Sequence, residues 1–211
     1  MDGLMFNTED IYWQVGSAVL RRRGCEFTKA LSNQMMGLRP EPAFGVMIRW
    51  HNLADSWQQL ARESEEFFTG LLDDQLTPMP GLLRLLDRLE QSGVPKAVGT
   101  SSARELTHAV LSRFQLEPRF QFILSAEDIV EGKPHPEIYL TAARRLGITP
   151  AEMLVLEDSH NGCRAAAAAG ALTVAVPGQH SRDHDFSVAT LQIESLADPR
   201  LYELLGIDAH G

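Results

Sequence analysis

Hydrophobic positions along the chain change their spacing near residue 77. Before that point, apolar residues recur every three or four positions over long stretches, which is typical of helices with one buried face. After it, helical stretches alternate with short continuous apolar runs of the kind that form buried strands. The sequence therefore predicts a helical part and a part in which strands and helices alternate.

The first part is predicted to contain helices only. In its first helix, Ile11, Val15, Ala18 and Val19 fall on one face. No run between residues 7 and 76 has the alternation and the flanking turn signals of a strand. The helices of this part are expected at about 9–23, 41–52 and 55–71.

The second part begins at Thr77-Pro78-Met79-Pro80-Gly81, because proline and glycine interrupt helices. A helix with leucines at 82, 85, 86 and 89 follows. Further helices are expected at about 103–114, 136–146, 161–169 and 198–205, and strands at about 94–99, 122–124, 153–157, 172–176 and 190–193. Since strands that alternate with helices form βαβ units, the sequence predicts an α/β fold with a parallel, doubly wound sheet.

Composition and charge narrow the class of protein. The chain is 44% hydrophobic and 22% charged, which is ordinary for a soluble globular protein. Its formal charge is −9, and its single basic run, Arg21-Arg22-Arg23, is expected on a solvated helix face, which argues against nucleic acid as a partner. No leader or long apolar run predicts secretion or a membrane span. Cys25 and Cys163 are therefore expected to be reduced thiols of a cytoplasmic protein.

Two motifs stand where predicted strands end, which is where an open α/β sheet binds its ligands. Thr100-Ser101-Ser102 opens a helix, so a hydroxyl and backbone N–H groups there can hold phosphate oxygens. A plain helix N-cap at Ser101 or Ser102 is the alternative. Glu157-Asp158 offers two hard anionic oxygens that suit Mg²⁺. An acidic cap for the following helix is the alternative there.

Taken in order, Asp2-Gly3, Thr100-Ser101-Ser102, Gly132-Lys133-Pro134 and Glu157-Asp158 resemble the motifs of the haloacid dehalogenase-like phosphatase superfamily. The resemblance is strongest to the subgroup that holds β-phosphoglucomutase, phosphoglycolate phosphatase and pseudouridine-5′-phosphatase. It implies a Rossmann-like doubly wound core of residues 1–12 and 78–211, with an α-helical cap of residues 13–77 inserted soon after the first motif.

The same resemblance implies roles for single residues. Asp2 would be the general acid of catalysis, and it would also bind Mg²⁺ through its backbone carbonyl. Glu157 and Asp158 would be the other metal ligands. Lys133 would bind the phosphate, although a lysine taken alone is ordinarily a solvated surface residue. The residues implied to hold the phosphate are Gly3, Thr100, Ser101 and Lys133, and those implied to act in catalysis are Asp2, Thr100 and Lys133.

Three further positions bear on the resemblance. In the cap segment Met36-Gly37-Leu38-Arg39, Arg39 resembles a substrate-specificity position and could pair with a substrate anion, although a solvated arginine is an equal alternative. Asn7 stands where the family commonly has Asp, at the hinge of the cap. His135 also replaces a common Asp and is expected to be a neighbour of its motif, not a ligand.

The function implied is that of a Mg²⁺-dependent phosphatase of a small phosphorylated metabolite, acting through an aspartyl-phosphate. In the family the attacking Asp ends an apolar strand immediately before the position of Met1, so a longer natural chain is expected. A phosphosugar mutase of β-phosphoglucomutase type and a non-catalytic binder of phosphorylated ligands are the alternatives. The protein is expected to be a monomer or a weak dimer. Replacing Lys133 by Met is expected to abolish most anion binding at little cost in stability.

Overall fold

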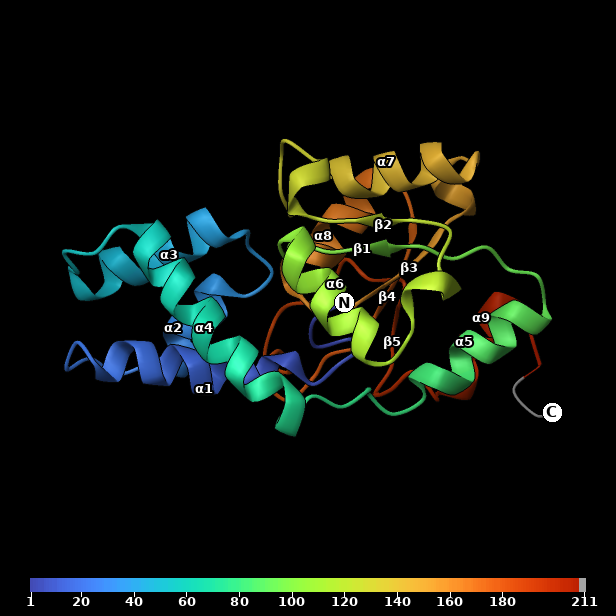
Figure 1. Ribbon diagram of the computed structural model, residues 1–211. Helices are drawn as coiled ribbons and strands as arrows, with labels where there is room; N and C mark the ends of the chain where they lie inside the picture. Colours follow the sequence, from blue (N-terminus) through green and yellow to red (C-terminus); the bar gives the residue numbers. More distant parts are fainter. Residues whose placement is uncertain (209–211) are drawn as a thin grey trace.

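The computed structural model describes residues 1–208, in which a helical part (residues 8–75, called the cap below) lies beside an α/β part (called the core) (Figure 1). The cap contains α1 (Thr8–Arg21), α2 (Lys29–Met35), α3 (Pro40–His51) and α4 (Trp57–Gln75). The core contains α5 (Leu82–Gln91), α6 (Arg104–Arg113), α7 (Glu137–Leu146), α8 (His160–Ala169) and α9 (Pro199–Leu205), with short 3₁₀ turns at Glu117–Arg119, Ala126–Asp128 and Pro150–Glu152. Its strands are β1 (Val98–Gly99), β2 (Ile123–Leu124), β3 (Leu154–Glu157), β4 (Leu172–Ala175) and β5 (Leu191–Gln192).

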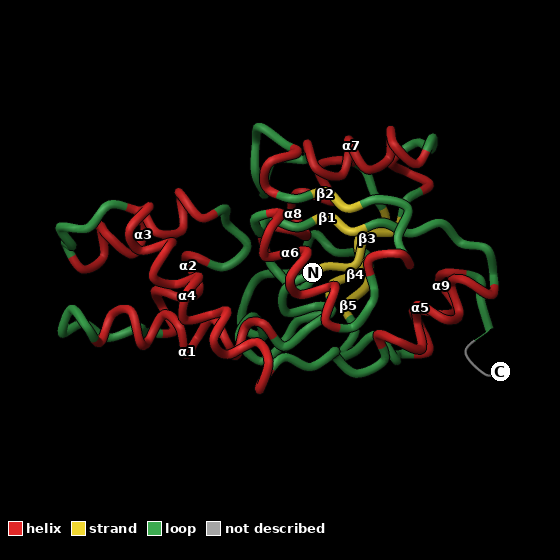
Figure 2. The backbone as a smooth tube through the Cα atoms, viewed as in Figure 1, coloured by secondary structure: helices red, strands yellow, loops and turns green. Residues whose placement is uncertain are grey.

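The strands are parallel, as predicted, and form two ladders. Val98 of β1 lies opposite Ile123 of β2, and Leu154 of β3 lies opposite Leu172 of β4, which in turn pairs with β5. In Figure 2 the ladders follow one another in the order β2, β1, β3, β4, β5. Within residues 1–208 no ladder joins β1 to β3, so the single sheet expected from the sequence consists of two ladders in an α/β fold.

Helices cover both sides of the strands. Helices α7 and α8 share an apolar cluster with β2 and β3, in which Leu124, Ile138 and Val155 are buried. Ala165 and Ala166 of α8 are completely buried in it, and such small side chains allow a helix to pack close to a strand. Helices α5, α6 and α9 share a second cluster with β1 and β4. None of the helices within residues 1–208 has the length and apolar composition needed to span a bilayer.

The cap is built on α1, which packs against α4. Ile11, Val15 and Val19 are almost completely buried, as predicted. Helix α2 was not predicted, because it is short and only Leu31 of its residues is buried, so its sequence carries little periodicity. The predicted boundary between residues 12 and 13 falls inside α1, which runs unbroken across it.

The basic run at the end of α1 is only partly solvated. Arg21 and Arg22 are exposed, as expected. The side chain of Arg23, in contrast, is 18% exposed and forms ion pairs with Asp55 (2.7 Å) and Glu63 (2.8 Å). Its guanidinium therefore joins the end of α1 to the segment that leads into α4 and to α4 itself.

Two chain segments cross between core and cap, and Asn7 joins them. Its backbone N–H donates to the Thr77 carbonyl (3.1 Å). Its side-chain amide donates to the Gln75 carbonyl (2.9 Å) and accepts from the Thr77 N–H (2.7 Å). An Asp here would lack the donor and would place a carboxylate oxygen against the Gln75 carbonyl. The amide therefore suits this hinge better than the acid that the family commonly has.

Candidate functional site

The predicted site residues converge where β1 and β3 end. Thr100 follows β1, Glu157 is the last residue of β3, and Asp158 follows it. The side chain of Lys133 bridges the two strand ends, since its Nζ donates to the Gly99 carbonyl (3.4 Å) and pairs with Glu157. This is the carboxyl edge of the parallel strands, where an open α/β sheet binds its ligands.

Asp2 reaches this edge from the N-terminal segment. Its Oδ2 accepts hydrogen bonds from the Thr100 hydroxyl (3.1 Å) and the Ser102 hydroxyl (2.7 Å), whereas its Oδ1 is buried and has no partner. Ser102 was not predicted as a site residue. The alternative of a helix N-cap at Ser101 or Ser102 is wrong, because the N-cap of α6 is Ala103 and no side chain caps that helix.

Lys133 is buried in an ion pair and is not a surface residue. Its side chain and that of Glu157 are each 6% exposed. The Tyr139 hydroxyl donates to the same oxygen, Oε1 of Glu157, and the Tyr139 ring centroid lies 5.3 Å from the Lys133 Nζ. Burial opposes ionisation of Glu157, but the charge of Lys133 holds the pKa of that carboxyl below its usual value. Tyr139 was missed, although a tyrosine on a buried helix face needs a partner for its hydroxyl.

Asp158 carries a poorly compensated charge. Burial and the neighbouring Glu157 carboxylate raise the pKa of Asp158 to about 7. Gly3, whose φ is +64°, gives this carboxylate its space, because a Cβ on Gly3 would lie 2.2 Å from the Asp158 Oδ2. The glycine of the first motif is therefore needed for the close approach of the N-terminal segment to the end of β3.

Ser159 connects the two acids to α8. Its hydroxyl donates to Glu157 Oε2 (3.0 Å) and, as the N-cap of the helix, accepts from the Gly162 N–H (3.0 Å). A Cβ on Gly162 would lie 1.9 Å from Glu157 Oε2, so this position requires glycine. The alternative in which Glu157 or Asp158 only caps this helix is therefore wrong.

A further carboxylate, Glu9 in the first turn of α1, faces the same acids. Burial, and then the charges of Asp158 and Asp2, raise the pKa of Glu9 well above its usual value. Sequence reasoning missed Glu9, because an acid in the first turn of a helix is ordinarily explained by the helix dipole. The half-buried Glu9 is therefore a fourth acid beside Asp2, Glu157 and Asp158.

The acidic groups fit a magnesium ion. Within residues 1–208, no three His, Cys, Asp or Glu side chains are grouped closely enough to hold a metal by themselves. Asp2 Oδ1 nevertheless has no partner, and the raised pKa values of Asp158 and Glu9 indicate negative charge that Lys133 does not balance. A hard cation with oxygen ligands would balance it, and Mg²⁺ combines such ligands with bound water.

Replacing Asp158 by Asn is expected to stabilise the metal-free protein, and increasingly so as the pH rises. The pKa of Asp158 is about 7 in the folded protein, whereas the ordinary value for an Asp, as in an unfolded chain, is 3.8. The folded state therefore loses stability as the pH rises between these values. Asn removes that loss. Thermal melts in EDTA are expected to show a gain of ~2 kcal/mol at pH 8, about half of what the full shift would give, and little difference at pH 4.5.

Asp55→Asn is the matched control. In the unchanged protein, hydrogen bonds from Arg23 hold the pKa of the Asp55 carboxyl below its usual value. Loss of that carboxylate is expected to destabilise the protein at pH 8. Mg²⁺ should raise the melting temperature of the unchanged protein and leave that of the Asp158→Asn variant unaltered. A gain for Asp158→Asn that is equally large at pH 4.5 and at pH 8 would contradict a buried charge at this position.

The cap loop contacts the core beside these acids. The Gly37 carbonyl accepts from the Ser101 hydroxyl (3.3 Å), and the Met36 carbonyl accepts from the side-chain amide of Asn161 (3.1 Å). The Ser101 side chain is therefore engaged with the cap, and its contact with phosphate stays a prediction.

Arg39 ties the cap to the core loop that precedes Lys133. Its guanidinium donates to the Val130 carbonyl (2.7 Å), and a Cβ on Gly132 would lie 2.6 Å from Arg39 Cδ. The half-buried side chain of Arg39 is therefore held where cap and core meet. Pairing of Arg39 with a substrate anion stays a prediction.

His135 and the two cysteines are not among the proposed site residues. His135 is exposed, and its Nδ1 accepts from the Glu137 N–H (3.3 Å), as expected of a motif neighbour. Cys25 and Cys163 are free thiols. Burial and the Glu157 charge raise the pKa of the Cys163 thiol to about 12, which makes it a poor nucleophile at neutral pH.

Several known proteins with similar sequences are named as phosphatases. Residues 1–176 match the model of the family described as haloacid dehalogenase-like hydrolase. The chain is 35% identical over 204 residues to the Drosophila melanogaster protein named "Probable pseudouridine-5'-phosphatase", with 94% of this chain and 88% of that protein covered. It is 26% identical over 213 residues to hexitol phosphatase B of Escherichia coli (strain K12), with 98% and 94% covered.

Solved structures agree on the fold. CbbY from Rhodobacter sphaeroides in complex with phosphate has a TM-score of 0.83 at 24% identity, with 94% of this chain and 92% of that chain covered. The relatives confirm the resemblance seen in the motifs, and they make phosphoric monoester hydrolase the enzyme class of this protein. The chain belongs to the haloacid dehalogenase-like hydrolase family.

Proposed function

We propose that this protein is a Mg²⁺-dependent phosphatase of a small phosphorylated metabolite that works through an aspartyl-phosphate. The observation that supports this most is the buried Lys133, which contacts the ends of both β1 and β3. A buried cation among carboxylates, at the edge where α/β sheets bind ligands, suits an anionic substrate. The phosphatases among the relatives favour a phosphate ester as that substrate.

The phosphate would lie against the Thr100 hydroxyl and the Lys133 ammonium group. Tyr139 and Ser159 hold the Glu157 carboxylate, and that carboxylate in turn holds Lys133. A fixed positive charge at this point offsets the repulsion between an anionic substrate and an anionic nucleophile. Because the supporting groups are buried, the cation needs little rearrangement when the substrate arrives.

Asp2 is the proposed general acid and base. Two hydroxyls hold its Oδ2, while its Oδ1, which has no protein partner, would pass a proton to the leaving group and later take one from water. The attacking carboxylate belongs, by the family resemblance, immediately before Met1 and thus ahead of the first residue of the sequence.

Asp158 and the backbone carbonyl of Asp2 are the proposed ligands of Mg²⁺, which when bound supplies positive charge at the phosphate. Glu157 was also predicted as a ligand. However, Oε1 of Glu157 already accepts hydrogen bonds from Lys133 and Tyr139, and Oε2 accepts one from Ser159. Its part in the proposal is therefore to hold Lys133 in place.

Calorimetric titration with inorganic phosphate and Mg²⁺ tests the proposal. Lys133→Met is expected to weaken binding tenfold or more, because it removes the charge, and Thr100→Val roughly two- to tenfold, because one neutral hydrogen bond is lost. Lys96→Met is the control, since Lys96 also pairs with a carboxylate, Glu90 (2.9 Å), but precedes β1 at the end away from the site. Unchanged phosphate binding by the Lys133→Met variant would contradict the proposed function.

A further inference from the structure

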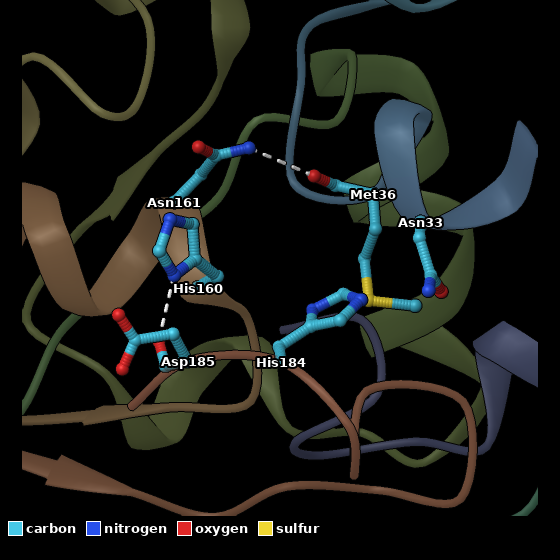
Figure 3. A pocket seen from close by; sticks show the side chains of 6 residues that line it. All are labelled: Asn33, Met36, His160, Asn161, His184 and Asp185. Atoms are coloured by element: carbon cyan, nitrogen blue, oxygen red, sulfur yellow. Dashed lines mark hydrogen bonds between the residues drawn. The ribbon is translucent and has the colours of Figure 1, made fainter. Parts of the chain in front are cut away.

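A pocket of about 200 Å³ lies between cap and core, next to the proposed phosphate site (Figure 3). Its lining residues are Asn33 and Met36 from the cap and His160, Asn161, His184 and Asp185 from the core. The pocket shares a wall with the phosphate site. The Met36 carbonyl accepts from Asn161 (3.1 Å), while the carbonyl of the next residue, Gly37, accepts from Ser101 (3.3 Å). A ligand with its phosphate at Thr100 and Lys133 would therefore have its other end beside this pocket.

The polar atoms of the lining are mostly hydrogen-bond acceptors. His160 Nδ1 donates to the Asp185 carbonyl (2.6 Å), and with the proton on this nitrogen the neutral form of the ring would offer Nε2 as an acceptor. The Asn161 amide nitrogen donates to Met36, which leaves Oδ1 of Asn161 to accept. Asn33 Oδ1 and the Asp185 carboxylate add further acceptors. A ligand that matches this lining must bring several donors, as a group with many hydroxyls does.

Two of these side chains have polar atoms that are buried without a partner. They are both ring nitrogens of His184 and Oδ1 of Asn33. Buried polar atoms are rarely left unpaired, so such atoms on the wall of a pocket point to a ligand or water that completes them. Figure 3 shows the thioether of Met36 extending toward the ring of His184 and the amide of Asn33. An unbranched methionine side chain adapts readily, so Met36 can move and uncover these atoms.

The charge and the size of the pocket further restrict the class of ligand that it can bind. Among the six described residues that line the pocket there is no lysine or arginine, whereas Asp185 adds a negative charge. A carboxylate or a second phosphate would be repelled there. A volume near 200 Å³ is also below the roughly 300–1,000 Å³ of pockets for drug-sized ligands, which suits a single sugar or polyol better than a nucleoside.

We infer that this pocket binds the leaving group of the substrate, and that this group is neutral, polyhydroxylated and the size of a single sugar or polyol. Asn33, Asn161 and His184 are its specificity-determining residues. The inference rests on the proposed function, which puts the phosphate beside the shared wall. It deepens that function by excluding leaving groups that carry a second anion.

Two phosphonates that resist hydrolysis separate the pocket from the phosphate site. Methylphosphonate has only the head group, and the methylene-phosphonate analogue of glucitol 6-phosphate adds a hydroxylated chain. In calorimetric titrations with Mg²⁺, the second is expected to bind at least tenfold more tightly than the first. His184→Phe, which keeps a ring of similar size, and Asn33→Leu are each expected to reduce this gain about three- to tenfold, the effect of one or two lost hydrogen bonds.

His51→Phe is the matched control, because His51 also has a buried ring nitrogen without a partner but ends α3, outside the pocket. Thermal melts of each variant check that it is folded. If the glucitol analogue still binds more tightly than methylphosphonate by the same factor in both His184→Phe and Asn33→Leu, the inference is overturned. Equal binding of the two phosphonates by the unchanged protein would also overturn it. Tighter binding of phosphonoacetate, or of a phosphonate analogue of pseudouridine 5′-phosphate, than of the glucitol analogue would also overturn it. Failure of methylphosphonate itself to bind, or binding that Lys133→Met does not weaken, would instead contradict the proposed function.

Discussion

A chain extended ahead of Met1 by an apolar strand that ends in Asp is expected to hydrolyse p-nitrophenyl phosphate more than a thousandfold faster than the chain that begins at Met1. Removal of the nucleophile from a covalent mechanism typically costs several orders of magnitude in rate. Strands β1 and β3 belong to separate ladders, and Lys133 contacts the ends of both. A parallel strand between them would bring its last residue beside Lys133 and Asp2.

The matched control is the same extension ending in Asn, which keeps the strand but removes the nucleophile. Thermal melts are expected to show that both extensions stabilise the fold, whereas phosphate release with Mg²⁺ should appear only with Asp. Equal turnover with and without the Asp would contradict the aspartyl-phosphate. A chain with the Asp that binds phosphate but releases none from any ester would favour the alternative of a non-catalytic binder.

Replacing Lys133 by Met is expected to lower the free energy of unfolding by about 3 kcal/mol, a larger effect than the small one expected from the sequence. The reason is the partner that the structure reveals. The side chains of Lys133 and Glu157 are each 6% exposed, so removing the cation leaves a buried carboxylate. Only the hydroxyls of Tyr139 and Ser159 would then donate to Glu157. Denaturant unfolding at pH 8 measures the loss.

A second substitution, Glu157→Gln, is expected to recover at least half of this loss. The amide carbonyl of Gln can still accept from Tyr139, but it carries no charge that needs compensation. The Lys133→Met/Glu157→Gln protein should therefore be more stable than Lys133→Met alone. Losses that simply add in the double variant would contradict a coupled pair at the ends of β1 and β3.

The spacing of apolar residues was sufficient to predict a helix where that helix buries one continuous face. The leucines of α5 at 82, 85, 86 and 89 are all buried, as their spacing predicted. It was insufficient for α2, in which Leu31 is the only buried residue. The division of the strands into two ladders was also beyond local reasoning, because strand pairing depends on residues that are distant in the sequence.

Three of the predicted site residues share a local signal that Tyr139, which was missed, does not have. Thr100, Glu157 and Asp158 each stand at or just after the end of an apolar run, which a single sequence displays. Tyr139 acts through a contact with Glu157, 18 positions away, and nothing local distinguishes it from a tyrosine that only packs in the core. For Lys133 the motif indicated the location correctly. The identity of its partner required the fold, and the buried pair with Glu157 makes the loss of stability now expected larger than the one expected from the sequence.

Asn7 limits the ways in which the cap can move. Asn7 bonds to both Gln75 and Thr77, and beside it Phe6 pairs with Pro78. The two segments that connect cap and core are therefore fastened side by side over a few residues and would act as a single pivot instead of two independent tethers. A body on one pivot can rotate, but it has little freedom to slide. The cap should therefore return to the same register with the core after each opening, so that Gly37 meets Ser101 again along one arc. A cap that returns to the same place would allow residues of cap and core to act as one binding surface.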